Sequence, residues 1–249
     1  MDYGLAGRTV LITGGSRGIG KAAAVRFAAE SAYVYVTYSS NRELANRTAE
    51  DIRRSGGSCE ALRLVLGDER SVRDAFDRIE RERGGLDVLV NNAVRWGEEA
   101  AIDEGSGEAW SDIVDRTVLG TYKVTRAAVP LMKRGGWGRI VFVSSSLVRD
   151  GKPGHTANLA SKAALHGFSR ALASELAADG IYSNVVIPEL TLSEWVTHAF
   201  PPAVLEEYAR SFPTGRLGTP DDVANLIAYL GSAANSFVNG EEIRVTGGK

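Results

Sequence analysis

The stretch VLITGGSRGIGKAAAVRFA, from Val10 to Ala28, decides the fold of this chain. It opens on apolar residues typical of a buried strand and closes on a helical pattern, with glycines between the two. Such glycines let backbone N–H groups approach a pyrophosphate, whose charge the positive end of the helix dipole favours. The stretch therefore predicts a nucleotide-binding β–α unit. The residues expected to bind the nucleotide are Gly14, Ser16, Arg17, Gly18, Ile19 and Gly20.

Apolar segments of strand length, rich in Val, Ile and Tyr, recur along the chain and alternate with helical patterns. They cover residues 8–13, 32–38, 60–65, 86–92, 139–145, 181–188 and 241–247. Several are almost continuously apolar, as expected for strands that are covered on both faces. The alternation predicts an α/β fold: a Rossmann-type, doubly wound, parallel seven-stranded sheet with helices on both faces.

No repeat, low-complexity segment or linker divides the sequence, so we expect residues 1–249 to form a single domain. A helical stretch at residues 193–212 interrupts the alternation before the last helix. We therefore expect a substrate-lid insertion at about residues 189–213.

The composition narrows the classes of protein to which the chain can belong. With 44% hydrophobic and 24% charged residues and a formal net charge of −2, it has the profile of an ordinary globular protein and lacks the basic excess of a nucleic-acid binder. A single cysteine, Cys59, fits a reducing compartment and argues against a cysteine-based metal cluster. No signal peptide or membrane-spanning run is visible. We expect a cytoplasmic protein with no nucleic-acid partner, no membrane partner and no metal.

The end of the second predicted strand indicates which nicotinamide cofactor would bind. An NAD site usually places a carboxylate there for the ribose 2′-hydroxyl, but residues 36–42, VTYSSNR, contain no acid. Arg17 and Arg42 could instead face a 2′-phosphate, with support from the hydroxyls of Ser39 and Ser40. NADP(H) is therefore the expected cofactor.

Further motifs resemble those of short-chain dehydrogenases/reductases over essentially the whole chain. They are TGGSRGIG (13–20), NNA (91–93), IVFVSSS (140–146), ASKAAL (160–165), VIP (186–188), GRLGTPDDVA (215–224) and VTGG (245–248). The resemblance implies hydride transfer between NAD(P)H and a small molecule by a homodimer or homotetramer. It also implies additional cofactor contacts from Asn91, Ala93, Lys162 and Pro188.

The family's catalytic set of Asn, Ser, Tyr and Lys is only half present. Ser145, which would polarise the substrate carbonyl, and Lys162, which would hold the nicotinamide ribose, are in place. The tyrosine position, four residues before the lysine, holds Asn158, and the helix asparagine position holds Thr117. An amide cannot act as a general acid at neutral pH, although Asn158 can donate a hydrogen bond to a substrate oxygen.

Three alternatives follow from this replacement. His155, seven residues before Lys162 and hence two helical turns away, could serve as a displaced acid, as in enoyl-thioester reductases that carry their tyrosine at this spacing. Alternatively, the electrophile needs no proton, as with an iminium carbon formed from a hemiaminal. In the third alternative the protein binds a nucleotide without redox turnover.

The predicted lid supplies the candidate substrate residues. Glu189 follows the VIP motif, where the family usually has glycine, and would favour a cationic or amine-bearing substrate. Trp96 and Trp195 could line an apolar pocket for a ring-containing secondary metabolite, and His198 is a second candidate acid. The leading hypothesis is an atypical NADPH-dependent reductase of a C=O or C=N⁺ carbon, with Ser145, Asn158, Lys162 and His155 as candidate catalytic residues.

Overall fold

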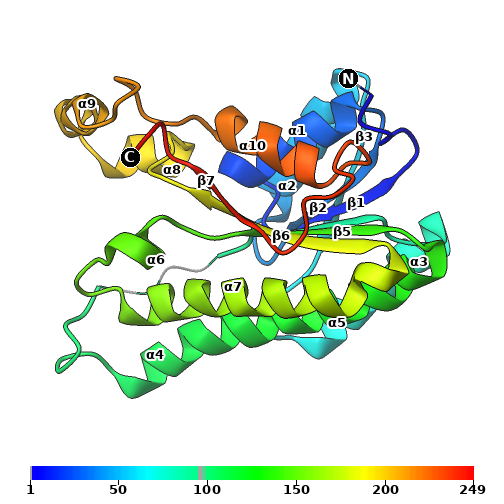
Figure 1. The fold of residues 1–249 in the computed structure, drawn as a ribbon, viewed down its shortest axis with the longest axis horizontal. Helices are drawn as coiled ribbons and strands as arrows, with labels where there is room; N and C mark the ends of the chain where they lie inside the picture. Colours follow the sequence, from blue (N-terminus) through cyan, green and yellow to red (C-terminus); the bar gives the residue numbers. More distant parts are fainter. Residues whose placement is uncertain (1, 95–96, 98) are drawn as a thin grey trace.

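A computed structural model describes residues 2–94, 97 and 99–249. In this part of the chain, seven parallel strands form one sheet in the order β3-β2-β1-β4-β5-β6-β7 (Figure 1). The strands are β1 (Thr9–Ile12), β2 (Tyr33–Tyr38), β3 (Ser58–Arg63), β4 (Val88–Asn91), β5 (Gly138–Val143), β6 (Ile181–Pro188) and β7 (Glu242–Val245). The predicted fold class, a doubly wound parallel α/β sheet, is confirmed.

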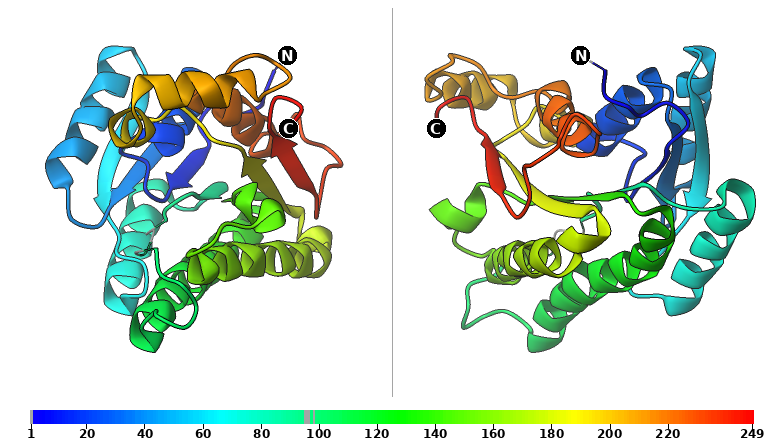
Figure 2. Two further views of the ribbon diagram at one scale, coloured as in Figure 1. Left: turned by 90° about the vertical axis from the view of Figure 1, so that its left-hand side faces the viewer. Right: turned by 45° about the vertical axis from the view of Figure 1, so that its right-hand side comes forward.

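Helices cover both faces of the sheet, as Figure 1 and the rotated views of Figure 2 show. One layer holds α1 (Gly18–Ala29), α2 (Arg42–Arg54) and α10 (Pro220–Leu230). The other holds α3 (Glu69–Arg83), α5 (Gly120–Gly135) and α7 (Thr156–Leu176). Shorter helices are α4 (Gly107–Val114), α6 (Leu147–Asp150), α8 (Glu194–Ala199) and α9 (Pro202–Arg210). Among the described residues, no helix has the length and apolar character needed to cross a membrane.

Neighbouring residues of one strand point into two different hydrophobic cores. In β1, Val10 and Ile12 pack beneath α1 and α10, whereas Leu11 packs in the core beneath α3, α5 and α7. In β2, Val34 lies in the first core and Tyr35 in the second. Because both faces are covered, the central strands β1 and β4 are buried at every position, which explains the nearly continuous apolar runs in the sequence.

The ends of several helices are fixed by local sequence signals. The Asp68 side chain accepts hydrogen bonds from the first turn of α3, and Thr219 forms a capping box with Asp222 at the start of α10. Hydrogen bonding from Arg216 holds the pKa of the Asp222 carboxyl well below its usual range. Gly84 and Gly136 end α3 and α5 in the left-handed conformation that glycine adopts without strain.

The predicted lid contains two short helices, α8 and α9, in place of the single helical stretch expected from its sequence. The break falls at Phe200, whose backbone is extended (φ −119°, ψ 134°). Pro201 explains the break, because a proline ring disfavours helical conformation in the preceding residue. Among the residues of the two helices, only Val196 is buried.

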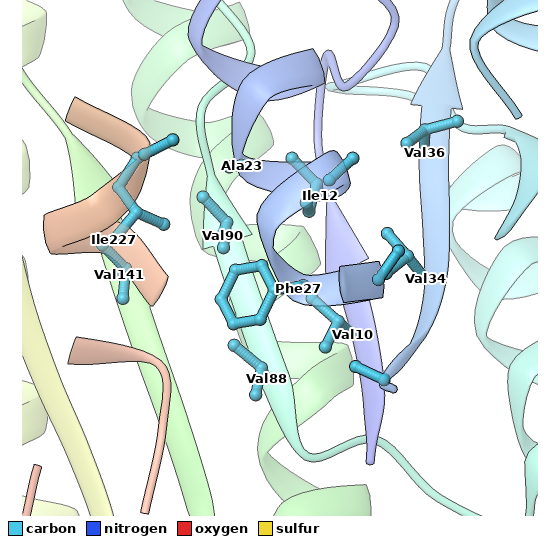
Figure 3. Packing of buried hydrophobic residues seen from close by; sticks show 14 of the residues in the cluster. Val10, Ile12, Ala23, Phe27, Val34, Val36, Val88, Val90, Val141 and Ile227 are labelled. Carbon is cyan, nitrogen blue, oxygen red and sulfur yellow. The ribbon is translucent and has the colours of Figure 1, made fainter. Parts of the chain in front are cut away.

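Phe27 is the largest side chain that α1 contributes to the core. It is 0% exposed and lies among Val10, Val88 and Val90 (Figure 3). We expect Phe27→Ala to lower the free energy of unfolding by about 3–5 kcal/mol, because it removes apolar contacts and leaves a cavity. Urea denaturation followed by circular dichroism would measure the change. The matched control is Val25→Ala on the same helix, where the side chain is 46% exposed and a change below about 0.5 kcal/mol is expected. Equal losses in the two variants would contradict this account of the core.

Candidate active site

The candidate site lies at the carboxyl edge of the sheet, where the strand order reverses. The chain runs from β1 outward to β2 and β3, then returns to place β4 on the other side of β1. In α/β proteins the loops that follow two such neighbouring strands run in opposite directions, and ligands commonly bind between them. The ends of β5 and β6 and the start of α7 border the same edge.

Hydrogen bonds between the ends of β1 and β4 fix the glycine-rich loop. The Thr13 hydroxyl accepts from the backbone N–H groups of Asn92 and Ala93, at 3.0 Å each. The Asn92 amide donates to the carbonyl oxygens of Thr13 (3.0 Å) and Gly14 (3.1 Å). A Cβ on Gly20 would lie 2.5 Å from the Gly14 oxygen and 2.6 Å from Asn92 Nδ2, so only glycine fits there.

The loop presents the start of α1 to an anion. Gly14 and Gly18 have positive φ values (63° and 55°), which glycine adopts without strain. The N–H of Gly18 donates a hydrogen bond to a carboxylate, Glu194 Oε2, at 3.0 Å. This carboxylate shows that the N-terminus of α1 can bind an anionic oxygen. The predicted phosphate-binding residues Gly14, Ser16, Arg17, Gly18, Ile19 and Gly20 all lie in this loop or in the first turn of α1.

The residues predicted to select the cofactor lie beside this loop. Arg17 precedes α1, Ser39 follows β2, and Arg42 begins α2, and all three are exposed. Among the described residues, neither guanidinium has a carboxylate partner within salt-bridge distance. Asn91 lies at the end of β4 and is 4% exposed. Its amide donates to Thr125 Oγ1 of α5 (3.2 Å), and its Oδ1 lacks a partner in the described part of the chain.

Ser145 follows β5, and its hydroxyl oxygen accepts from the N–H of Leu147 (3.3 Å). The serines on either side are buried: Ser144 is 5% and Ser146 2% exposed. Ser144 Oγ lies 2.7 Å from His166 Nε2, and His166 Nδ1 lies 2.8 Å from Glu242 Oε2 of β7. The three adjacent serines therefore have different surroundings, and Ser144 belongs to a hydrogen-bond chain that the sequence reasoning missed.

Asn158 and Lys162 stand one turn apart on α7, and both are 4% exposed. Asn158 Oδ1 accepts from the backbone N–H of Gly97, at 3.4 Å, so the amide contacts the segment that follows β4. Lys162 Nζ donates to the carbonyl oxygen of Val143 at 2.6 Å. Burial lowers the pKa of the Lys162 ammonium to about 8, because the charged form loses its hydration.

His155 is the N-cap residue of α7 and therefore precedes the first turn of the helix. Its side chain is almost buried, with 9% exposed. The ring nitrogen Nδ1 lies 3.1 Å from the Pro153 oxygen. Nε2 lies 3.3 Å from Lys152 Nζ and 3.2 Å from Glu99 Oε1.

Thr117 occupies an unusual backbone segment. It is buried (4% exposed) in a π-helical turn, Asp115–Leu119, between α4 and α5. Short π-helical turns of this kind are rare and are frequently found at functional sites. The residue periodicity of the sequence gave no indication of this turn.

The predicted substrate residues fall into three situations. Glu189 directly follows β6, and its Oε2 is buried without a hydrogen-bond partner among the described residues. Trp195 and His198 lie on α8 and are exposed; Trp195 packs edge-on against Phe200 at a centroid distance of 6.4 Å. Trp96 lies outside the described residues. Pro188, at the end of β6, accepts from the N–H of Ser146 (3.0 Å) and so adjoins the end of β5.

Comparisons with known proteins agree with this architecture. The family model described as enoyl-(acyl carrier protein) reductase matches residues 14–249. The 3-oxoacyl-[acyl-carrier-protein] reductase FabG of Staphylococcus aureus (strain Mu50) is 32% identical over 241 residues, which cover 97% of each chain. A short-chain type dehydrogenase/reductase of Picea abies is 35% identical over 252 residues, covering 98% of this chain and 93% of the relative.

A solved structure gives the same result. The crystal structure of a dehydrogenase/reductase from Sinorhizobium meliloti 1021 matches with a TM-score of 0.90 at 33% identity. The match covers 99% of this chain and 96% of that one. The protein therefore belongs to the short-chain dehydrogenase/reductase family of oxidoreductases.

Proposed function

We propose that the protein is an NADPH-dependent reductase that transfers hydride to a C=O or iminium carbon of a small molecule through an atypical active site. The observation that carries the proposal is that Asn158 and Lys162 stand one turn apart on α7, both buried, with Lys162 bound to the carbonyl oxygen of Val143 at the end of β5. Asn158 Oδ1 is engaged by Gly97, and its Nδ2 has no acceptor among the described residues. That N–H group is therefore placed to donate to a substrate. Reductase activity is also supported by the relatives, whose names describe reduction of acyl-carrier-protein substrates.

The glycine-rich loop fits a nicotinamide dinucleotide. Gly18 and Gly20 would hold the diphosphate. Gly18 offers its backbone N–H, and Gly20, which has no side chain, lets the start of α1 pack closely against the loop. Arg17 and Arg42 would pair with a 2′-phosphate, and Lys162 would hold the ribose. When bound, NADPH supplies the hydride.

The side chains around the acceptor carbon favour an electrophile that needs no external acid. Asn158 and Ser145 can donate hydrogen bonds to a substrate oxygen, which stabilises developing negative charge. Glu189 brings a carboxylate oxygen without a partner among the described residues, which suits a cationic group. Hydride addition to an iminium carbon forms the C–H bond and leaves a neutral amine, so no proton is required. A ring-containing metabolite with such a group, covered by the lid at residues 189–213, is the proposed substrate class.

A second candidate function is enoyl reduction with His155 as the acid. The description of the matching family model and the burial of His155 at the start of α7 favour it. The proximity of His155 Nε2 to Glu99 and Lys152 counts against it, because those groups compete for the ring nitrogen that would have to serve the substrate.

The expected preference for NADPH over NADH can be tested at the two arginines. We expect Arg17→Ala and Arg42→Ala each to raise the Kd for NADPH by about ten- to a hundredfold, because hydrogen bonds to a charged group contribute about 1.5–3 kcal/mol. The Kd for NADH should hardly change, which fluorescence titration of both nucleotides would measure. Arg47→Ala is the matched control, since Arg47 lies on α2, as Arg42 does, and its guanidinium already pairs with the Glu43 carboxylate at 2.5 Å. Tighter binding of NADH than of NADPH by the unaltered protein would contradict the assignment.

Asn158 gives a prediction about the substrates that the protein can reduce. With NADPH, we expect measurable reduction of a cyclic iminium and poor reduction of simple ketones, because general-acid catalysis typically contributes about 10²–10⁴-fold. Asn158→Tyr should raise the ketone rate if the site has only lost its acid, and should lower it if the pocket is shaped around the amide.

His155→Ala tests the second candidate function, enoyl reduction, because unchanged kcat on an enoyl thioester excludes His155 as the acid. Loss of kcat in His198→Ala instead would assign the acid to that second candidate histidine. Binding of NADPH without oxidation across all three substrate classes would reject the reductase.

Lys162 gives a pH-dependent prediction. Since the pKa of its ammonium in the free protein is about 8, the group loses its charge above that pH and holds the ribose and phosphates less well. The Kd for NADPH should stay level below pH 8 and rise above it, by up to about tenfold per pH unit. In Lys162→Met the Kd should be higher and nearly independent of pH over the same range. An equally steep rise in that variant would assign the titration to another group.

A further inference from the structure

The first residue of the lid helix α8 reaches back to the glycine-rich loop. Glu194 Oε2 accepts a hydrogen bond from the backbone N–H of Gly18 at 3.0 Å, although the two residues are 176 positions apart. A Cβ built on Gly18 would lie 3.4 Å from the Cβ of Ser193, an ordinary van der Waals distance. The start of the lid therefore lies directly against the loop that begins α1.

The sequence of α1 leaves its own N-terminus without an anionic partner. Its N-cap residue, Arg17, makes no side-chain capping bond, and the first turn contains no acidic residue. By contrast, α2, α3 and α10 carry N-caps from their own sequence: Asn41, Asp68 and Thr219. Helix N-termini carry a partial positive charge that favours anions. At α1 the lid supplies that anion.

We propose that the Glu194 carboxylate competes with the diphosphate of the cofactor for the N-terminus of α1, and so sets both the cofactor affinity and the position of the lid. The inference rests on the proposed function, because it presumes that a dinucleotide binds at this loop. A diphosphate needs the same N–H groups, and its charge repels a carboxylate placed among them. Binding of the cofactor would therefore release Glu194 and free α8 from the loop.

The remaining contacts of the lid allow such a movement. At one end, Leu192 donates to the Gly218 oxygen at 2.8 Å. At the other end, buried Phe212 packs beneath the Lys249 ammonium, 4.7 Å from its ring centroid. Between these anchors, α9 has no buried residue and α8 has only Val196. A segment with so few buried contacts opens at low free energy, and this leaves the Glu194 bond as a main restraint on α8.

The first experiment measures affinity in the full chain. We expect Glu194→Gln to lower the Kd for NADPH about three- to tenfold, since the carboxylate charge opposes the diphosphate. Adenosine 2′-monophosphate, which has no diphosphate, should bind the variant and the unaltered protein equally. Glu207→Gln is the matched control, because it removes the same charge from an exposed position of the lid. The gain in affinity should shrink as salt concentration rises.

The second experiment follows the lid by hydrogen exchange of residues 194–199. NADPH should increase exchange there in the unaltered protein, whereas Glu194→Gln should exchange fast with or without nucleotide. Weaker binding of NADPH by Glu194→Gln, or protection of α8 by NADPH, would overturn the competition and assign the contact to the bound state. Failure of both proteins to bind any nucleotide would overturn the proposed function, and with it the competition. Tight binding that is indifferent to Glu194 overturns the competition alone.

Discussion

The junction between β1 and β4 is the constraint on which the rest of the site depends. Across it, Asn92 donates two hydrogen bonds to Thr13, from its backbone N–H and from its side-chain amide, and the amide also donates to the Gly14 carbonyl. Gly20 packs against this junction so closely that any side chain would collide with it. The last glycine of the loop is therefore required by the packing of α1 on the sheet, whether or not a nucleotide is bound. A helix start held this tightly presents its N–H groups in a fixed direction, which is what recognition of an anion needs.

Helix α7 places three polar side chains along one face at intervals of four residues. Asn158 accepts a hydrogen bond from the N–H of Gly97, and Lys162 donates one to the carbonyl of Val143. His166 shares a hydrogen bond with the hydroxyl of Ser144. Residues four apart lie above one another on a helix, so these contacts fix the helix against the segment after β4 and the end of β5. The last contact continues through His166 to Glu242 and thus ties the edge strand β7 to the same position. The position of Lys162 is consequently determined from both directions along the helix.

The sheet could be predicted closely from the sequence. All seven predicted strands lie within two residues of those observed. The signal is clearest in the central strands, which are buried on both faces and almost continuously apolar. Single positions were harder to predict. The sequence SSS could not show that Ser144 turns to His166 while Ser145 does not, because alternation along a strand becomes irregular where the strand ends. The π-helical turn at Thr117 likewise depends on local backbone geometry. The break at Phe200, by contrast, is marked in the sequence by Pro201.

Contacts between distant segments are the hardest features to predict from a sequence, but the contact at the start of α1 has a signal in the sequence. A helix that opens on Arg17 and Gly18, with no capping side chain and no acid in its first turn, has unsatisfied N–H groups that something else must meet. In α/β proteins that partner is commonly a phosphate, and the glycine pattern supports this interpretation. The structure adds a second partner, Glu194, from a helix that buries almost nothing of its own. The missing cap is therefore consistent with either partner, and the weak packing of α8 would allow Glu194 to leave when a phosphate binds.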